Sequence, residues 1–415
     1  MKQYPLIEIG DQALQQLVHF CRERNLNKFM LVADENTWGV LGERVDHLLR
    51  EQGWDVKTAM LTGENIDSDE RSFMQVFLAG DQLERTYLAV GSGVITDTTR
   101  FTSKVTRNQF ISLPTAPSVD AYAPINAALT INGVKGSVLC HAPQAIFVDL
   151  DTICQAPKRM AASGFSDLVS KLAATADWRI NSLLWHAHFD GEIYERAMDA
   201  AQSMVDVHEG IARGDRESMR KFIACQLESG KCMIDYGDST PVAGAEHQIE
   251  HLWGMLWYHQ NRHGLMHGES VGVGVVITSR WYEQLRAINK QEAEKRLADL
   301  KIQSRLEQEN ELRRQLGPLA EAAIQSNPIL FQMSDPQQFN KIRGQILENW
   351  DEIQNIARLV PSSQQFVDWM QKVGAPTLPQ EIGISEHEVM LAKEYAHSYR
   401  DRFSIAVLRK LLGIE

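Results

Sequence analysis

Short apolar runs and longer amphipathic stretches alternate along the first part of the chain. The apolar runs, each about as long as a buried strand, cover residues 29–33, 87–90, 110–113 and 145–148. The stretches between them repeat their apolar positions with the period of an α-helix and cover residues 12–24, 39–52 and 68–79. Strands that alternate with helix-length segments predict βαβ units and a parallel sheet.

A hairpin is predicted before the last of these strands. Residues 127–131 and 137–139 form two further apolar runs, and Asn132-Gly133 follows the first of them. An Asn-Gly pair favours a tight two-residue turn, because both residues readily adopt positive φ.

The pattern changes after Pro157, where strand-like runs end and helical periodicity continues to the C-terminus. We therefore expect two domains, an α/β domain over residues 1–155 and an all-α domain over residues 156–415. The charge-rich stretch 283–316 has few apolar positions and predicts a solvated amphipathic helix.

Composition supports a globular protein of 415 residues, with 44% hydrophobic and 23% charged residues. The net charge of −12 argues against a nucleic-acid partner or an anionic membrane surface. No apolar run reaches the roughly 18 residues of a membrane span, and no secretory signal is visible at the N-terminus. Five sparse cysteines indicate reduced thiols. We expect a cytoplasmic protein.

A glycine-containing turn joins one predicted strand to the following helix. Gly91-Ser92-Gly93 lies there, and Asp97 follows within the helix. Such a turn lets backbone N–H groups at a helix N-terminus approach a pyrophosphate, although a tight turn without a ligand has the same pattern.

Two other strand ends carry polar residues. Asp34 can bind the ribose hydroxyls of a nucleotide, which would favour NAD over NADP, or it can cap the next helix. Thr115, Ser118 and Asp120 follow residues 110–113 in a loop stiffened by two prolines, and can face a cofactor or substrate.

Histidines gather in one short region of the second half, at positions 247, 251, 259, 263 and 267. His247 and His251 are four residues apart and share one helix face. His267 precedes a helix rich in small apolar residues, and Asp167 is expected in the first turn of an earlier helix. One carboxylate and two imidazoles form a common ligand set for a divalent catalytic metal.

Other functions are compatible with parts of this pattern. His247 to His251 matches the H-x-x-E-H motif of a zinc protease, in which Glu250 would be the general base. That motif leaves the βαβ half unexplained. A nucleotide-binding redox sensor without turnover is a further alternative.

Five segments occur in an order that resembles the sn-glycerol-1-phosphate dehydrogenase family, within the larger group of metal-dependent glycerol dehydrogenases, iron-type alcohol dehydrogenases and dehydroquinate synthases. The resemblance covers about residues 28–280. The segments are residues 91–97, 113–120, 161–167, 244–247 and 266–269.

The resemblance implies a dehydroquinate-synthase-like architecture, with a Rossmann-like domain followed by an all-α domain. It implies that Asp167, His247 and His267 bind one divalent metal, which is zinc, nickel or iron. It assigns His251 and Asp120 to catalysis, with His251 lining the site as a proton relay. The segment 91–97, Thr115 and Ser118 are assigned to NAD or NADP.

The implied reaction interconverts a small polyol, or its phosphate, and the corresponding ketone, with dihydroxyacetone phosphate and sn-glycerol 1-phosphate as the expected pair. Glycerol dehydrogenase, another polyol dehydrogenase and a lyase that uses NAD transiently are the alternatives on this fold. A homodimer or larger homo-oligomer is also implied. Thr240 and Ala243 stand where this family typically has arginine and serine, so the phosphate group needs a separate test.

Overall fold

The computed structural model describes residues 4–81, 83–185 and 187–415, and the chain forms two compact units. Unit 1 comprises residues 1–168, 203–239 and 372–374, and unit 2 comprises residues 169–202, 240–371 and 375–415. The two units are described separately below.

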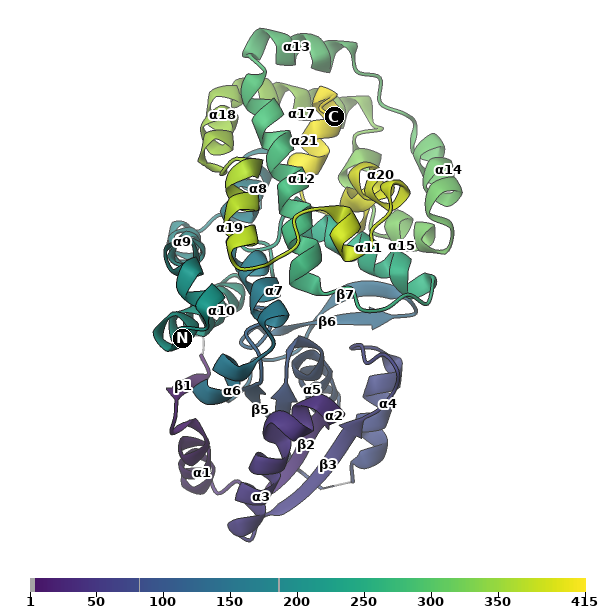
Figure 1. Ribbon diagram of the computed structural model, residues 1–415. Coiled ribbons are helices and arrows are strands. Elements are labelled where there is room, and N and C mark those ends of the chain that lie inside the picture. Colours follow the sequence, from purple (N-terminus) through teal and green to yellow (C-terminus); the bar gives the residue numbers. More distant parts are fainter. Residues whose placement is uncertain (1–3, 82, 186) are drawn as a thin grey trace. The chain divides into compact units, whose positions relative to one another are not determined.

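A parallel sheet forms the centre of unit 1 (Figure 1). Its strand order is β1-β8-β5-β4-β2-β3. The strands are β1 (Leu6–Gly10), β2 (Lys28–Asp34), β3 (Asp55–Leu61), β4 (Thr86–Gly91), β5 (Phe110–Pro114) and β8 (Ala145–Asp149). The predicted parallel sheet is confirmed, and β1 and β3 are additions to it at the two edges.

Helices cover both faces of this sheet, so its inner strands are buried on both sides and are apolar almost throughout. On one face, Leu17 of α1 (Ala13–Glu23) and Val45 of α3 (Glu43–Glu51) belong to one hydrophobic cluster with the strands. On the other face, Val76 of α4 (Glu70–Ala79) and Ile95 of α5 (Gly93–Val105) belong to a second cluster. The predicted helix 39–52 is observed as the π-helical turn η1 (Trp38–Gly42) followed by α3, and the short helix α2 (Glu35–Thr37) precedes it.

The strand order reverses direction between β2 and β4. The chain passes from β2 to β3 on one side and then returns to β4 on the other side of β2. In open α/β sheets, ligands bind at the carboxyl ends of the strands that flank such a switch point. Here those ends carry Asp34 and Gly91.

The predicted hairpin is confirmed as an antiparallel pair, β6 (Asn126–Ile131) and β7 (Val134–Leu139). Asn132 has φ 51° and Gly133 has φ 74°, which is the positive-φ pair that a tight hairpin turn needs. Unit 1 also includes α6 (Leu150–Gln155), most of α7 (Lys158–Val169) and α10 (Arg216–Tyr236), while α9 (Gly191–Arg213) runs through both units.

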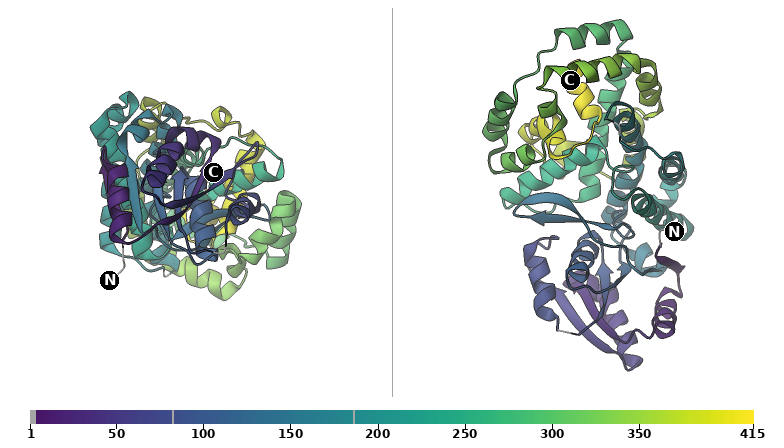
Figure 2. Two further views of the ribbon diagram at one scale, coloured as in Figure 1. Left: turned by 90° about the horizontal axis from the view of Figure 1, so that it is seen from below. Right: turned by 180° about the vertical axis from the view of Figure 1, so that it is seen from behind.

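Every regular element of unit 2 that the structure describes is a helix (Figure 2). The α-helices are α8 (Lys171–Trp185), α11 (Ala245–His259), α12 (His267–Ala287), α13 (Lys290–Asp299), α14 (Arg305–Leu316), α15 (Ala320–Gln325), α16 (Ile329–Gln332), α17 (Pro336–Glu348), α18 (Trp350–Leu359), α19 (Ser363–Lys372), α20 (Glu386–Tyr395) and α21 (Ile405–Leu412). Short 3-10 turns are η2 (Gly317–Leu319), η3 (Pro379–Ile382) and η4 (Ala396–Tyr399). Within the described residues, none of the helices has the length and apolarity needed to span a bilayer.

Two helix predictions need correction. The stretch 283–316 is not one helix but the end of α12, then α13 and α14. Asn289 and Ser304 interrupt it, because each side chain accepts a backbone N–H and starts a new helix. Asp167 lies near the end of α7, not in the first turn of a helix, because α7 already begins at Lys158.

A close contact between α7 and the loop after β5 depends on a glycine. A Cβ atom built on Gly164 would lie 1.9 Å from the carbonyl oxygen of Pro117. The Gln226 side chain of α10 donates a hydrogen bond of 3.0 Å to the same oxygen. The loop that carries Thr115, Ser118 and Asp120 is therefore held by backbone contact with α7 and by α10.

We expect Gly164→Ala to destabilise the protein by about 1–3 kcal/mol, because the backbone must move to admit a methyl group. Gly344→Ala is the matched control, since Gly344 lies inside α17 with no atom within 4 Å of a built Cβ. The control should stabilise by up to about 1 kcal/mol through helix propensity. Urea unfolding of both variants measures the difference, and equal effects would contradict the contact.

Candidate metal centre and nucleotide-binding edge

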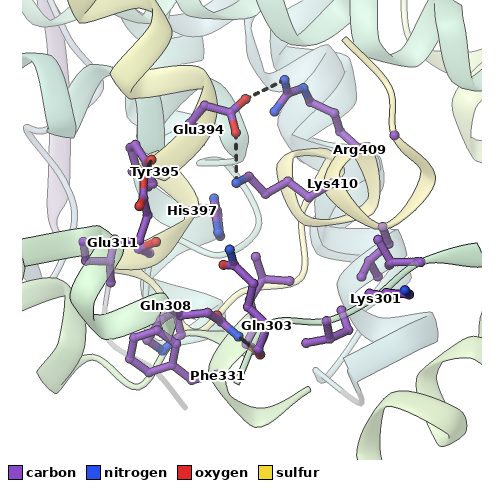
Figure 3. Close-up of a pocket in the computed structure, with 18 of the residues that line it drawn as sticks. Lys301, Gln303, Gln308, Glu311, Phe331, Glu394, Tyr395, His397, Arg409 and Lys410 are labelled. Atoms are coloured by element: carbon purple, nitrogen blue, oxygen red, sulfur yellow. Dashed lines mark hydrogen bonds and ion pairs between the residues drawn. The ribbon is translucent and has the colours of Figure 1, made fainter. Parts of the chain in front are cut away.

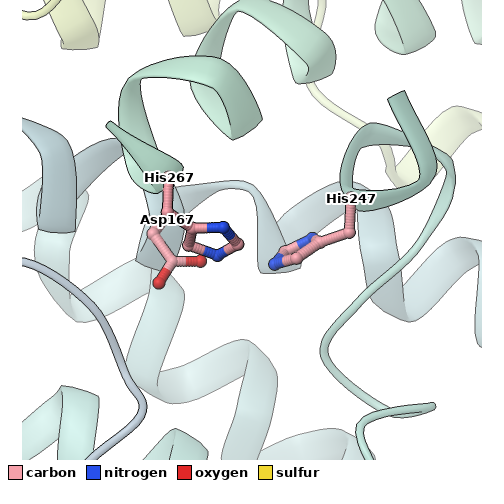
Figure 4. Close-up of side chains that lie close together, drawn as sticks. All are labelled: Asp167, His247 and His267. Carbon is pink, nitrogen blue, oxygen red and sulfur yellow. The ribbon is translucent and has the colours of Figure 1, made fainter. Parts of the chain in front are cut away.

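Three predicted metal ligands lie together. Asp167 of α7, His247 of α11 and His267 of α12 each offer one donor atom, and these atoms lie within 4.8 Å of one another (Figure 4). Asp167 and His247 are buried, and the His267 side chain is 28% exposed. One carboxylate and two imidazoles fit a divalent transition metal and leave coordination positions for a substrate.

Two buried carboxylates hold the imidazoles by the same ring atom. Nδ1 of His247 is 2.7 Å from Oε1 of Glu246, and Nδ1 of His267 is 3.2 Å from Oε1 of Glu250. Both glutamates are at most 2% exposed. A carboxylate at Nδ1 fixes the ring and makes Nε2 the better ligand atom, which is the usual outer arrangement of metal-binding histidines.

Asp120 lies beside the carboxylate of the group. Its backbone N–H donates a hydrogen bond of 3.2 Å to Oδ2 of Asp167. Its own carboxylate accepts a bond of 2.7 Å from the Ser229 hydroxyl on α10. The structure thus places predicted catalytic Asp120 and predicted ligand Asp167 next to each other within unit 1.

His251 follows His247 by one helical turn on α11 but is not a member of the three-residue donor group. Its Nδ1 lies 3.3 Å from Nη2 of Arg400. His263 is exposed in the loop between α11 and α12. A protease of the H-x-x-E-H type would need His247 and His251 as joint ligands and Glu250 as base, whereas Glu250 here contacts His267.

The glycine turn lies at the switch point of the sheet. Gly91 ends β4, Ser92 occupies the N-cap position, and α5 begins at Gly93. The backbone N–H of Thr115 donates to the Gly91 carbonyl at 3.3 Å, so the loop after β5 is adjacent. A Cβ on Gly93 would come within 2.9 Å of the Val119 side chain, so a larger residue at position 93 would displace that side chain.

Asp34 caps a helix in this structure. Its Oδ1 accepts the Thr37 backbone N–H at 2.8 Å, and the Thr37 hydroxyl in turn accepts the Asp34 N–H at 3.0 Å. This capping box fixes Asp34 at the carboxyl end of β2, beside the glycine turn. The cap accounts for one carboxylate oxygen, so capping and ribose binding are compatible.

Asp97 forms an ion pair with Arg100, which is fully buried. The guanidinium of Arg100 also donates to the carbonyl groups of Ala121, Tyr122 and Asn126. Asp97 is therefore joined, through Arg100, to the segment that follows Asp120. Arg100 was not a sequence-based candidate, because an arginine in a helix carries no signal of burial.

Comparisons with known proteins identify the family to which the chain belongs. The model of the iron-containing alcohol dehydrogenase family matches residues 8–157. A glycerol-1-phosphate dehydrogenase [NAD(P)+] of Geobacillus thermodenitrificans is 30% identical over 404 residues, which are 96% of this chain and 90% of that protein. The chain belongs to the glycerol-1-phosphate dehydrogenase family. The resemblance read from the motifs is confirmed.

More distant members and solved structures extend the comparison. The glycerol-1-phosphate dehydrogenase [NAD(P)+] of Pyrococcus horikoshii is 29% identical over 270 residues, 65% of this chain and 76% of that protein. A probable glycerol dehydrogenase from Sinorhizobium meliloti has TM-score 0.63 at 16% identity, over 100% of this chain and 98% of that one. Butanol dehydrogenase A from Thermotoga maritima also has TM-score 0.63, at 13% identity and the same coverage. These structures confirm the predicted architecture.

Sequence reasoning named Glu250 only as the base of a protease, and it missed the buried charged residues Arg100, Lys171 and Glu246. Spacing contains a signal for three of these four residues. Lys171 follows Asp167 by four residues and is fully buried, while both glutamates lie beside or between the histidines of α11. A charged residue within one helical turn of a ligand is a candidate outer partner.

A cavity of about 630 Å³ elsewhere in unit 2 contains none of the predicted site residues (Figure 3). Among its charged side chains, Glu394 accepts from both Arg409 and Lys410. His397 lies at its wall, and burial holds the pKa of that imidazole well below its usual value. We assign no step of the family's chemistry to this cavity.

The first turn of α11 is fixed by two buried carboxylates. Oδ2 of Asp177 accepts the Ala245 N–H at 2.7 Å, and Oε1 of Glu246 accepts the Gly244 N–H at 2.7 Å. Oδ1 of Asp177 also accepts from the Tyr282 hydroxyl at 2.7 Å and from the Ile405 N–H at 2.6 Å. Burial, and then the charge of Glu246, raise the pKa of Asp177 to about 7.

The stability contribution of Asp177 should therefore depend on pH. The unfolded carboxyl titrates near 3.8 and the folded one near 7, so the folded state holds the extra proton between these values. The unfolding free energy consequently falls as the pH rises through this window, by up to about 1.4 kcal/mol per pH unit.

Asp177→Asn removes this titration but also disturbs the hydrogen bonds. We expect the stability advantage of wild type over Asp177→Asn to shrink between pH 5 and pH 7. Urea unfolding of the metal-free proteins at several pH values measures it. A difference that is constant with pH would mean that Asp177 stays ionised in the folded state.

Proposed function

We propose that this chain is an NAD(P)-dependent, metal-dependent dehydrogenase that reduces dihydroxyacetone phosphate to sn-glycerol 1-phosphate. The observation that carries the proposal is the group of Asp167, His247 and His267, in a chain whose family membership extends over nearly its whole length. Outer carboxylates orient both imidazoles, which is the arrangement expected of a built metal site.

Asp167, His247 and His267 would hold one divalent metal, and zinc, nickel and iron all suit this donor set. When bound, such an ion acts as a Lewis acid that polarises a carbonyl group. Glu246 and Glu250 hold the imidazole rings, and the Asp120 N–H holds the Asp167 carboxylate. These contacts fix the ligand directions before a substrate arrives.

The sheet edge supplies the nucleotide site in this proposal. The turn Gly91-Ser92-Gly93 and the start of α5 receive the pyrophosphate. Asp34 accepts from the ribose hydroxyls, which favours NAD over NADP. Thr115, Ser118 and Asp120 lie around the nicotinamide, and Asp97 acts through Arg100 by holding the adjacent segment.

Reduction transfers a hydride from the nicotinamide to the carbonyl carbon and a proton to its oxygen. We assign the proton relay to His251, because an imidazole suits proton transfer near neutral pH. We further propose residues 1–155 as the nucleotide-binding domain and residues 156–415 as the metal- and substrate-binding domain, in a cytoplasmic homodimer or larger homo-oligomer.

A glycerol dehydrogenase is the second candidate function. Thr240 and Ala243 replace an arginine and a serine of the family pattern, and an arginine is a strong partner for a phosphate dianion. Their absence favours an unphosphorylated polyol.

NADH oxidation with dihydroxyacetone phosphate and with dihydroxyacetone, side by side, separates the two functions. The protein is stripped of metal and reloaded with zinc, nickel or iron in turn. We expect kcat/KM to be higher for the phosphate and the product not to be oxidised by sn-glycerol-3-phosphate dehydrogenase. A preference for dihydroxyacetone would establish the second candidate instead.

The metal assignment is tested by His267→Ala. We expect metal content, measured by mass spectrometry, to fall below one-tenth of wild type and turnover to disappear. NADH binding, measured by nucleotide fluorescence, should persist because the glycine turn is untouched. His263→Ala is the control, since His263 is exposed and outside the group. Unchanged metal content in His267→Ala would remove His267 from the ligand set.

A further inference from the structure

We propose that the cavity of about 630 Å³ in unit 2 is a binding site for a small organic anion with an apolar body. The residues that line this cavity lie between positions 300 and 414, and all of them belong to unit 2. A volume of roughly 300–1,000 Å³ is typical of small-molecule sites. None of the described lining residues is a candidate metal ligand or nucleotide contact, so the proposal is independent of the dehydrogenase activity.

The charged side chains that line the cavity favour an anionic ligand. Among the described residues, four of these side chains are cationic and two are acidic, namely Lys301, Arg314, Arg409 and Lys410 against Glu311 and Glu394. Their net charge is therefore +2, whereas the whole chain has a net charge of −12. A concave surface with an excess of one sign of charge attracts ions of the opposite sign.

The excess positive charge lies on two parts of the wall. The Glu394 carboxylate accepts from both Arg409 and Lys410, so one positive charge remains on that side. Lys301 forms no ion pair or hydrogen bond with any residue that the structure describes. An anion in the cavity can therefore contact the Lys301 ammonium without displacing a carboxylate.

His397 is a buried hydrogen-bonding group on the same wall (Figure 3). The residue is 4% exposed, and within the described part of the chain its ring nitrogens have no hydrogen-bond partner. Burial, and then the charges of Lys410 and Arg409, hold the pKa of this imidazole well below its usual value, so the ring is neutral near pH 7. A neutral imidazole has one N–H donor, which His397 can offer to an anion in the cavity.

Apolar side chains on the wall predict that the anion has an apolar part. Leu312, Phe331, Leu411 and Ile414 line the cavity, and each is at most 5% exposed. Small-molecule sites typically combine such apolar walls with a few placed polar groups. An inorganic anion would leave these side chains without a contact, so we expect the ligand to be an organic acid.

Hydrogen bonds between distant segments hold the walls of the cavity. Nε2 of Gln308 on α14 donates to the Leu330 carbonyl of α16 at 3.1 Å and to the Ser334 hydroxyl at 2.9 Å. The Tyr395 hydroxyl of α20 donates to Oε1 of Glu311 on α14 at 2.8 Å. A site that is formed before its ligand arrives loses less conformational entropy on binding.

The fluorescent anion 8-anilinonaphthalene-1-sulfonate tests this proposal, since it has a sulfonate and an apolar body. It is added to the full-length protein with saturating NAD, which occupies the candidate nucleotide site. We expect saturable binding that is on the order of tenfold tighter than that of N-phenyl-1-naphthylamine, which lacks the sulfonate. Equal affinity for the two probes would overturn the assignment to an anion.

Two variants locate the bound probe. Lys301→Gln removes one cation and should raise the Kd about threefold to tenfold. Leu330→Trp fills part of the cavity without changing its charge and should raise the Kd more than about tenfold. Lys341→Gln is the control for loss of a positive charge, since Lys341 is exposed on α17 and does not line the cavity. The control should leave the Kd unchanged.

His397→Phe keeps a ring of similar shape and removes the N–H donor, so it should also raise the Kd. An unchanged Kd in Leu330→Trp would overturn the site, because the probe would then bind elsewhere. Unchanged values in both Lys301→Gln and His397→Phe would overturn the proposed recognition of the anion. An equal loss in Lys341→Gln and Lys301→Gln would overturn it as well, because the charge of the whole chain would then be the cause.

Discussion

A single buried carboxylate, that of Asp177, joins four helices of unit 2. It belongs to α8 and accepts hydrogen bonds from the start of α11, from Tyr282 of α12 and from the first residue of α21. A buried carboxylate is costly unless it is hydrogen-bonded, so these three donors are constrained together. This constraint sets the direction in which α11 begins, and with it the position of His247 two residues later.

The first turn of α11 also positions the candidate metal ligand His247. Oε1 of Glu246 accepts a hydrogen bond from the Gly244 N–H and also lies beside Nδ1 of His247. One side chain therefore links the loop before α11, the start of α11 and the candidate ligand. Glu250 repeats the arrangement one turn later for His267. The candidate nucleotide site of unit 1 has a different basis, because the parallel sheet brings three strand ends, those of β2, β4 and β5, to one edge.

The apolar pattern predicted the inner strands of the sheet and the Asn132-Gly133 hairpin correctly, because both follow from local rules of side-chain alternation and backbone conformation. It missed β1 and β3, which are edge strands with partly exposed residues and therefore a weaker signal. It merged α12, α13 and α14, because helical periodicity continues across Asn289 and Ser304 although each caps a new helix.

The sequence by itself determined the alternation of strands and helices and the change to an all-helical second half, because periodicity is a local property. Through its family motifs it also offered Asp167, His247 and His267 as candidate ligands. Only the tertiary structure decided which imidazole nitrogen faces a carboxylate, that Asp34 caps a helix, and that Arg400 lies against His251. Those contacts join residues up to 149 positions apart. The contacts of His251 with Arg400 and of His267 with Glu250 depend on how helices pack, and packing leaves no mark in the spacing of residues along the chain. The cap at Asp34 is local, and the sequence offered it as one of two roles that only the structure could decide between.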